Sequence, residues 1–279
     1  MNEPVMFDRQ RPIDAVRASM REASDILKRR GNLILMTTTF LLCLLITFTW
    51  FSVGQLLGFL LELVLPFISL PQAQKALEGL WLMLSALTFL AGVMPAWLGR
   101  LRLAGLLCTG EHPMAREVLY YYTSPRRWGR AILVGLFLAF EVMLPAVLSL
   151  GAFAGGLALY NEVFLFYLPE ALAVLLLLGG FLMALALSAA IFLLCGLYLL
   201  FAAIAVGNEE MPVWNAFVVA LGYGKRNLIS IFLFSLHSLW HLVLSLCTFG
   251  VLLVFWYAHH YTLSYLRLSM ALTKGEDLS

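Results

Sequence analysis

The chain has 279 residues, of which 62% are hydrophobic and 12% are charged, and its formal net charge is +2. So little polar surface cannot enclose a core of ordinary proportions in water, which excludes the usual soluble globular classes. The small net charge also argues against nucleic acid as a partner, because binding to it would need a strongly basic face. The composition therefore predicts a single integral membrane domain over residues 1–279.

The cysteines and the N-terminus add two further expectations. Cys43, Cys108, Cys195 and Cys247 lie in or beside apolar runs and form neither a Cys-x-x-Cys pair nor a Cys/His cluster. We expect them to pack in the interior, with no disulfide framework, no zinc site and no cofactor. About thirty N-terminal residues are polar and lack the short apolar core of a cleaved signal peptide, so the first apolar run is expected to be an uncleaved anchor.

The N-terminal segment, residues 1–31, is predicted to hold an amphipathic helix on the cytosolic side. Residues 13–27 place apolar side chains three and four positions apart, with charged side chains on the other side. Pro12 fits the first turn of this helix, and Gly31 ends it. The helix either packs on the other loops or lies in the lipid headgroup layer, and the sequence leaves both possibilities open.

The apolar runs that follow predict six membrane crossings, at about 20 residues per crossing. Residues 56–70 are expected to form an interfacial helix and turn, and residues 196–206 to emerge and pack on neighbouring helices. Pro95 is expected to kink the second crossing without breaking it, and Arg100 and Arg102 mark its exit. The predicted crossings form three pairs: 33–53 with 80–98, 132–156 with 171–206, and two helices within 228–272 that turn at 248–250.

A repeat runs through the chain and is clearest at Leu101–Leu133. This segment contains the exit of one apolar run, a Pro-started amphipathic helix, an arginine cluster and the entry to the next run. A shift of 99 positions brings Glu111 and Pro113 onto Glu210 and Pro212. We predict an all-α helical bundle made of three repeats, each a surface helix plus a membrane hairpin, at approximately residues 12–111, 112–209 and 210–279.

The distribution of basic residues predicts the orientation. Of the 18 Lys and Arg residues, 17 lie in the N-terminal segment, in loops 100–130 and 207–226 or near the C-terminus, and only Lys75 lies in an opposite-side loop. The positive-inside rule then places both termini in the cytosol of a multi-pass plasma-membrane protein, which requires an even number of spans. Basic clusters before the spans are expected to contact anionic lipid headgroups: Lys28, Arg29, Arg30, Arg126, Arg127, Arg130, Lys225 and Arg226.

Gly110-Glu111, with the amphipathic helix and the basic entry to a span that follow it, resembles a motif of a widespread group of bacterial membrane proteins. These uncharacterised families are related to the membrane portion of glycerophosphodiester phosphodiesterases. The resemblance implies an all-helical, six-span protein of a bacterial inner membrane. It carries over no catalytic residues, and no hydrophilic segment of this chain is long enough for the α/β barrel of the phosphodiesterase.

Ionisable side chains within the apolar runs form the candidate functional site, because such groups usually face the bundle interior or a wet cavity. Counted from the ends of their apolar runs, Glu141, His237 and His259 fall at a similar depth in the membrane. His237 and His241 are four residues apart and therefore face one way on their helix. Three interpretations remain open: a structural carboxylate–imidazole hydrogen bond, a proton- or solute-linked site, and a shared metal. The candidates are Glu141, His237, His241, His259 and His260.

The sequence contains no GxSxG elbow, phosphate-binding loop or dinucleotide fingerprint, so we expect no enzymatic activity. We predict a non-enzymatic membrane protein that acts in envelope upkeep or as a scaffold or partner for other membrane proteins. The alternative is a small transporter or channel that uses the Glu141/histidine layer. Spans one, two and four are nearly free of charged groups, which favours the scaffold.

Overall fold

The computed structural model describes residues 12–29, 31–64, 71–160, 169–247 and 253–274, and the regular structure within these ranges is helical. The predicted all-α class is therefore confirmed. The elements are α1 (Pro12–Lys28), α2 (Asn32–Val64), α3 (Pro71–Thr109), the 3₁₀ helix η2 (Ala115–Tyr122), α4 (Pro125–Leu159), α6 (Glu170–Gly207), α7 (Val213–Arg226), α8 (Leu228–Cys247), the π-helical turn η4 (Leu253–Tyr257) and α9 (Ala258–Lys274).

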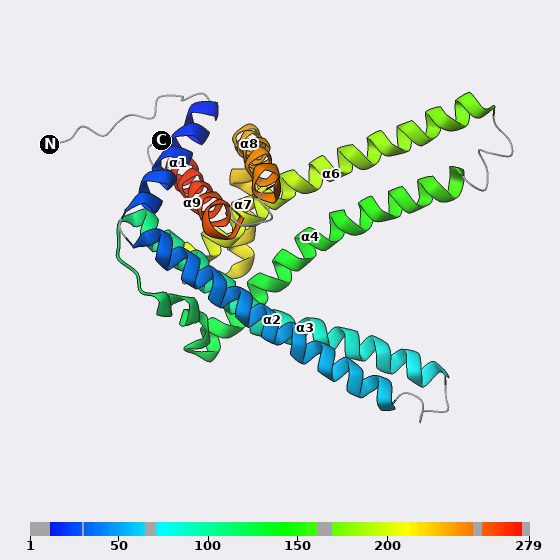
Figure 1. The fold of residues 1–279 in the computed structure, drawn as a ribbon, viewed down its shortest axis with the longest axis horizontal. Coiled ribbons are helices and arrows are strands. Elements are labelled where there is room, and N and C mark those ends of the chain that lie inside the picture. Colours follow the sequence, from blue (N-terminus) through cyan, green and yellow to red (C-terminus); the bar gives the residue numbers. More distant parts are fainter. Residues whose placement is uncertain (1–11, 30, 65–70, 161–168, 248–252, 275–279) are drawn as a thin grey trace.

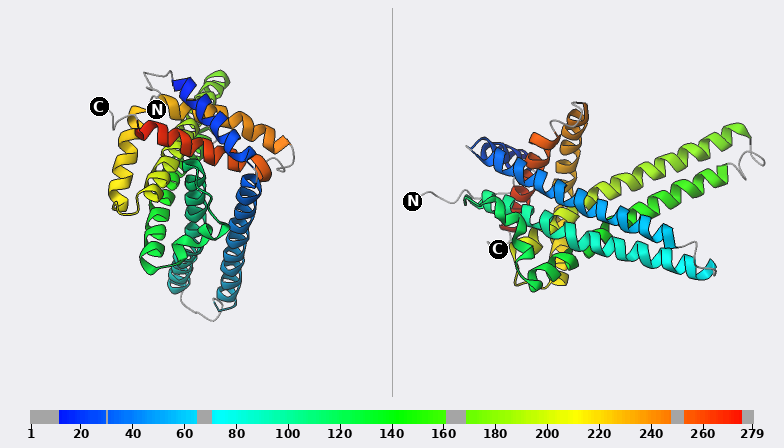
Figure 2. Two further views of the ribbon diagram at one scale, coloured as in Figure 1. Left: turned by 90° about the vertical axis from the view of Figure 1, so that its left-hand side faces the viewer. Right: turned by 60° about the horizontal axis from the view of Figure 1, so that its bottom comes forward.

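Two long helical hairpins dominate the shape of the molecule (Figure 1). Helix α2 packs against α3 and α4 packs against α6, and the two hairpins diverge from one end of the molecule. Helices α1, α7, α8 and α9 gather at that end, which we call the hub. Figure 2 shows that α8 and α9 run across the direction of α2 and α3 instead of alongside them.

The hydrophobic core lies in the hub, whereas the hairpins expose large apolar side chains. Core residues such as Leu27, Leu103 and Leu263 come from the first, third and last helices and are 0 to 1% exposed. Along the α2–α3 hairpin, by contrast, Phe48 is 68% exposed and Leu82 is 73% exposed. Apolar surface of this extent is unfavourable in water and is expected for side chains that face lipid.

Two helices among the described residues are long and apolar enough to cross a membrane, Asn32–Leu61 and Ala73–Thr109. A third candidate is the bent pair Val213–Arg226 and Leu228–Ser238, whose halves meet at 85°. These two or three candidate spans indicate a membrane location. The count of six spans stays a prediction.

Helices α2 and α3 are both longer than predicted. Residues 56–64 continue α2 and do not form a separate interfacial helix, because Gly54 and Gln55 do not interrupt it; residues 65–70 lie outside the described part of the chain. Glycine is tolerated in membrane helices, where apolar surroundings favour an intact backbone hydrogen-bond ladder. Helix α3 likewise continues through Arg100 and Arg102 to Thr109, so these arginines do not mark its end.

The second hairpin and the last two helices follow the predicted pattern more closely. Helix α6 is one continuous element of 38 residues, and its C-terminal part is buried in the hub through Leu200, Phe201 and Ala205. This confirms that residues 196–206 pack on neighbouring helices. The predicted turn at residues 248–250 lies outside the described part of the chain, between α8 and η4.

A helix occupies each of the three places where the repeat predicts a surface helix, namely α1, η2 and α7. The middle helix is 3₁₀ and begins at Ala115, not at Pro113. With three residues per turn, Val118 and Tyr121 project from the same side, and both are buried. Whether the three units are copies of one another stays a prediction.

Pro95 lies inside α3 and cannot donate the backbone hydrogen bond that the carbonyl of Ala91 would normally accept. The indole Nε1 of Trp128 in α4 donates to this carbonyl instead, at 3.0 Å. The hydroxyl of Tyr122 donates to the next carbonyl, that of Gly92. Trp128 thus compensates for the proline and fixes α4 against this part of α3.

We therefore expect the Trp128→Phe substitution to lower the free energy of unfolding by about 1 kcal/mol, the usual contribution of one hydrogen bond. In a Pro95→Ala background the same substitution should cost less, because the restored N–H of residue 95 can donate to Ala91. Reversible unfolding of all four proteins in mixed micelles measures this coupling. An equal cost in both backgrounds would contradict the assigned role of Trp128.

Gly99 allows the backbone of η2 to approach α3. A Cβ atom at this position would lie 2.3 Å from the carbonyl oxygen of Val118, and a backbone atom cannot move aside without shifting η2. Gly105, two turns further along the same helix, has no atom within 4 Å of its ideal Cβ position.

The two glycines should respond with opposite signs to substitution by alanine. We expect Gly99→Ala to destabilise the protein by about 1–3 kcal/mol through overpacking. Gly105→Ala should stabilise it by up to about 1 kcal/mol, because alanine is the better helix former. Unfolding of the two variants under identical micelle conditions tests this. The close approach of η2 would be refuted if Gly99→Ala were as stable as Gly105→Ala.

Candidate functional site

A buried charge lies where α2, α3 and α9 meet. Arg100 in α3 is only 4% exposed, and its Nη2 donates to the Nδ1 of His259 in α9 at 2.9 Å. The Nε2 of His259 lies 3.0 Å from the hydroxyl of Thr37 in α2. Because a guanidinium can only donate, Nδ1 must accept, and the ring proton is assigned to Nε2, which donates to Thr37.

Aromatic faces supply the remaining stabilisation of this charge. The guanidinium carbon of Arg100 lies 5.0 Å from the ring centroid of Phe40 and 5.9 Å from that of Trp97. Phe40 also packs edge-on against the ring of His259. Among the described residues, no carboxylate lies within ion-pair distance of Arg100, and its buried Nε has no partner. This cation is thus held by an imidazole and π faces, which contribute attraction without a counter-charge.

His259 is kept neutral by this environment. A protonated ring would carry a hydrogen on Nδ1 that faces the guanidinium donor, and two cations would be in contact. The cluster of Arg100, His259 and Thr37 therefore requires one tautomer of one protonation state.

A second cluster, centred on Tyr120, joins η2 to the loop between α6 and α7. The Tyr120 hydroxyl donates to Oε2 of Glu209 at 2.9 Å, while Arg102 donates to Oε1 of the same carboxylate at 2.9 Å. Arg102 also lies 3.5 Å from Glu117. The guanidinium carbons of Arg102 and Arg127 lie 3.9 and 4.1 Å from the centroid of the Tyr120 ring, so they must occupy opposite faces. The two cations and two carboxylates balance.

Arg130 binds the end of α6. Its guanidinium donates to the carbonyl oxygens of Ala205, Asn208 and Met211 at 2.6–2.9 Å. The last carbonyls of a helix have no partner within the helix, and a cation there also interacts favourably with the helix dipole. Arg130 was predicted to contact lipid headgroups; both of its Nη atoms donate within the protein, and the predicted lipid contact stays a prediction.

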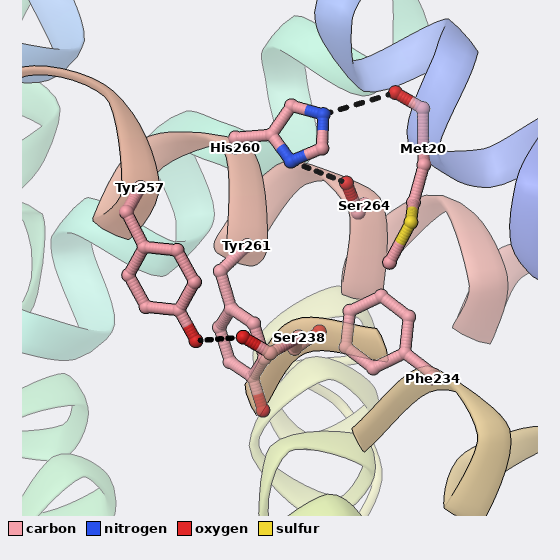
Figure 3. A pocket seen from close by; sticks show the side chains of 7 residues that line it. All are labelled: Met20, Phe234, Ser238, Tyr257, His260, Tyr261 and Ser264. Carbon is pink, nitrogen blue, oxygen red and sulfur yellow. Dashed lines mark hydrogen bonds between the residues drawn. The ribbon is translucent and has the colours of Figure 1, made fainter. Parts of the chain in front are cut away.

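A small hollow lies between α1, α8 and α9 (Figure 3). The Nε2 of His260 donates to the carbonyl of Met20 in α1 at 3.1 Å, and its Nδ1 accepts from Ser264 at 3.5 Å. Tyr257 donates to the carbonyl of Ser238 in α8 at 3.2 Å. The hollow has a volume of about 10 Å³, roughly the space that one water molecule needs. Ser264 is fully buried beside His260.

The structure places the predicted polar residues in different surroundings. His259 and His260 bind groups of α1, α2 and α3, and His237 lies on an exposed face of α8. The side chains of Glu141 in α4 and His241 in α8 lie outside the described part of the structure. A contact between Glu141 and a histidine stays a prediction.

The predicted headgroup residues also differ among themselves. Lys28, Arg29, Arg126, Lys225 and Arg226 are exposed at the hub, and Arg30 lies outside the described residues. The guanidinium of Arg127 lies over the ring of Tyr120 and also donates to the hydroxyl of Thr123. Thus, not all the basic residues of the clusters are free to meet lipid.

Sequence reasoning missed Arg100 and Arg102 as site residues. They follow a long apolar run, where an arginine usually marks the exit of a span, and so they were interpreted only as markers. Their partners His259 and Glu209 lie 159 and 107 positions further along the chain. The one available signal was their spacing of two, which turns the two side chains toward different neighbours of one helix.

The donors in these clusters are guanidinium, hydroxyl and neutral imidazole groups. The described residues contain no group of three or more His, Cys, Asp and Glu side chains that could hold a metal ion. Comparison with protein-family models, with curated proteins and with solved structures finds no match for this chain. The function must therefore be inferred from geometry.

The Arg100 cluster predicts a pH dependence of stability. The ring of His259 must be neutral for its Nδ1 to accept from Arg100, so the fold favours the deprotonated ring, whereas a free imidazole titrates near about 6.5. This contribution is complete above about pH 6.5 and is lost progressively as the pH falls below that value. We expect the unfolding free energy in micelles to fall over this acidic range, and to fall less in His259→Gln, which cannot titrate. Identical pH profiles for the two proteins would exclude this role.

Proposed function

We propose that this chain is a multi-pass plasma-membrane protein without enzymatic activity, which serves as a scaffold for other membrane proteins or in upkeep of the envelope. The observation that carries the proposal is the contrast between the hub and the hairpins. The α2–α3 hairpin exposes apolar side chains such as Phe48 and Leu82, whereas the described ion pairs lie in the hub. Such a division fits hairpins in lipid and a hub at the membrane surface.

The orientation follows from the same contrast. The hub contains the clusters of Arg100, Arg102 and Arg130, while Lys75 lies at the opposite end of α3. The positive-inside rule then supports a cytosolic hub with both termini on that side. Four of the six predicted crossings correspond to α2, α3, α4 and α6, and the other two correspond to α8 and α9.

Anionic lipid headgroups are the partner that the surface of the hub favours. Each Lys or Arg close to an anionic membrane surface contributes about 1 kcal/mol of binding. Four of the predicted contact residues that are exposed are Lys28, Arg29, Arg126 and Lys225. The relation to bacterial families with a membrane portion like that of glycerophosphodiester phosphodiesterases remains an expectation from the motif around Gly110.

The scaffold is preferred to a transporter because the described histidines are already engaged. Both ring nitrogens of His259 are used by Arg100 and Thr37, and both of His260 by Met20 and Ser264. Neither ring has a nitrogen left for Glu141 without breaking a hydrogen bond. A proton- or solute-linked layer would need groups that can exchange partners at low cost.

The two ends of α3 test the orientation. Ala73 and Thr109 lie near opposite ends of this helix, and both are exposed. In intact cells, an impermeant thiol reagent should label Ala73→Cys and should not label Thr109→Cys until the membrane is opened. The unsubstituted protein is the control, since Cys43 and Cys108 are buried. The reverse labelling would overturn the orientation, and labelling of both would place the helix outside a membrane.

A further inference from the structure

We propose that the α8–α9 hairpin does not cross the bilayer but lies within the cytosolic leaflet at the depth of α1, with the outer face of α8 against lipid acyl chains. This inference rests on the proposed membrane location and orientation. It replaces the fifth and sixth predicted crossings by an in-plane hairpin and leaves four crossing helices. That number is still even, as two termini on the same side require.

Helix α1 sets the depth. It carries charged side chains along its outer surface, of which Arg17, Arg21 and Asp25 are exposed. Charged side chains are strongly unfavourable at the centre of a bilayer, so a helix with several of them cannot lie there. Its apolar face does not need lipid, since Val16, Ala23 and Leu27 are buried in the protein core. Helix α1 therefore lies at the surface of the membrane.

The α8–α9 hairpin contacts α1 at residues midway along its two helices, and not only at the end where α8 joins α7. His260 donates to the carbonyl of Met20, and Arg267 lies 3.4 Å from Glu22. Met20 also reaches between the two arms of the hairpin and lines the hollow with Phe234 and Ser238 of α8 (Figure 3). Both arms thus share the depth of one charged helix.

A crossing hairpin is incompatible with these contacts. Ser238 lies ten residues after Leu228, and in a helix along the membrane normal it would be about 15 Å below the start of α8. The contacts of Met20 with the hollow would then bring α1 and its charges close to the bilayer centre. The direction of α8 and α9 across α2 in Figure 2 avoids this conflict.

The polarity of α8 indicates which of its faces meets lipid. Its buried face combines apolar side chains such as Phe234 with hydroxyl groups such as that of Ser235, while Leu236 on its outer face is 53% exposed, with His237 beside it. An outer face that carries large exposed apolar side chains fits a helix that borders acyl chains better than one that borders water. The exposed Lys225 and Arg226 at the junction with α7 suit the anionic headgroups above those chains.

Depth measurements along α8 test the proposal. The exposed residues Ile229, Phe232 and Leu236 project from one face, and seven residues separate the first from the last. An encoded fluorescent amino acid at each position, in the full chain within vesicles, is quenched by lipids brominated at shallow or deep acyl carbons. For an in-plane helix we expect the same shallow depth at all three positions. In a crossing helix the depth would change by about 10 Å.

Helix α2 provides the matched control. Leu41, Leu45 and Phe48 are also exposed and also span seven residues, and their depth should increase steadily. If the α8 series deepens like the α2 series, the in-plane hairpin is refuted while the membrane proposal stands. If the α2 series is not quenched, the proposed function itself fails. Because the native cysteines are kept, the result does not depend on a cysteine-free protein that folds.

Discussion

The positive charge of Arg100 is the constraint on which the centre of the molecule depends. A guanidinium that is buried without a carboxylate must find acceptors or π faces. Otherwise the free-energy cost of removing it from water is not offset and the fold is destabilised. Here one helix supplies the charge, a second supplies Phe40 and Thr37, and a third supplies His259. Each of these groups satisfies a polar atom of another. Removing any one of them therefore leaves a buried polar group without its partner. Three helices far apart in the sequence are thereby held in one arrangement.

The same requirement explains how the remainder of the hub is assembled. Arg130 satisfies carbonyls at the end of α6, and Trp128 satisfies the carbonyl that Pro95 leaves without a donor. Tyr120 is held between two guanidinium groups and is bonded to Glu209. These contacts join η2 and α4 to α3, to the end of α6 and to the loop between α6 and α7. Within lipid, by contrast, the hairpins need only internal backbone hydrogen bonds and apolar surfaces.

Sequence patterns predicted the helices better than they predicted the contacts between them. Apolar spacing located α1 within a few residues, and the long apolar run of α6 gave one helix. Residues 56–64 were expected to form a separate interfacial helix but continue α2, and the close approach of η2 to α3 at Gly99 is a contact that no local pattern contains. His259 was recognised as a costly polar group, but nothing in the sequence links it to Arg100, 159 positions earlier.

The prediction of a shared Glu141/histidine layer rests on counting residues along apolar runs. Residue number converts to depth only if every helix follows the membrane normal, and α8 and α9 run across α2. A better marker of depth is a charged helix whose position is fixed by solvation, as for α1 with Arg17 and Arg21. Any residue that binds its backbone shares that depth, whatever the hydropathy of its own segment. His260 does so through Met20, and this one hydrogen bond says more about its place in the membrane than the apolar residues around it.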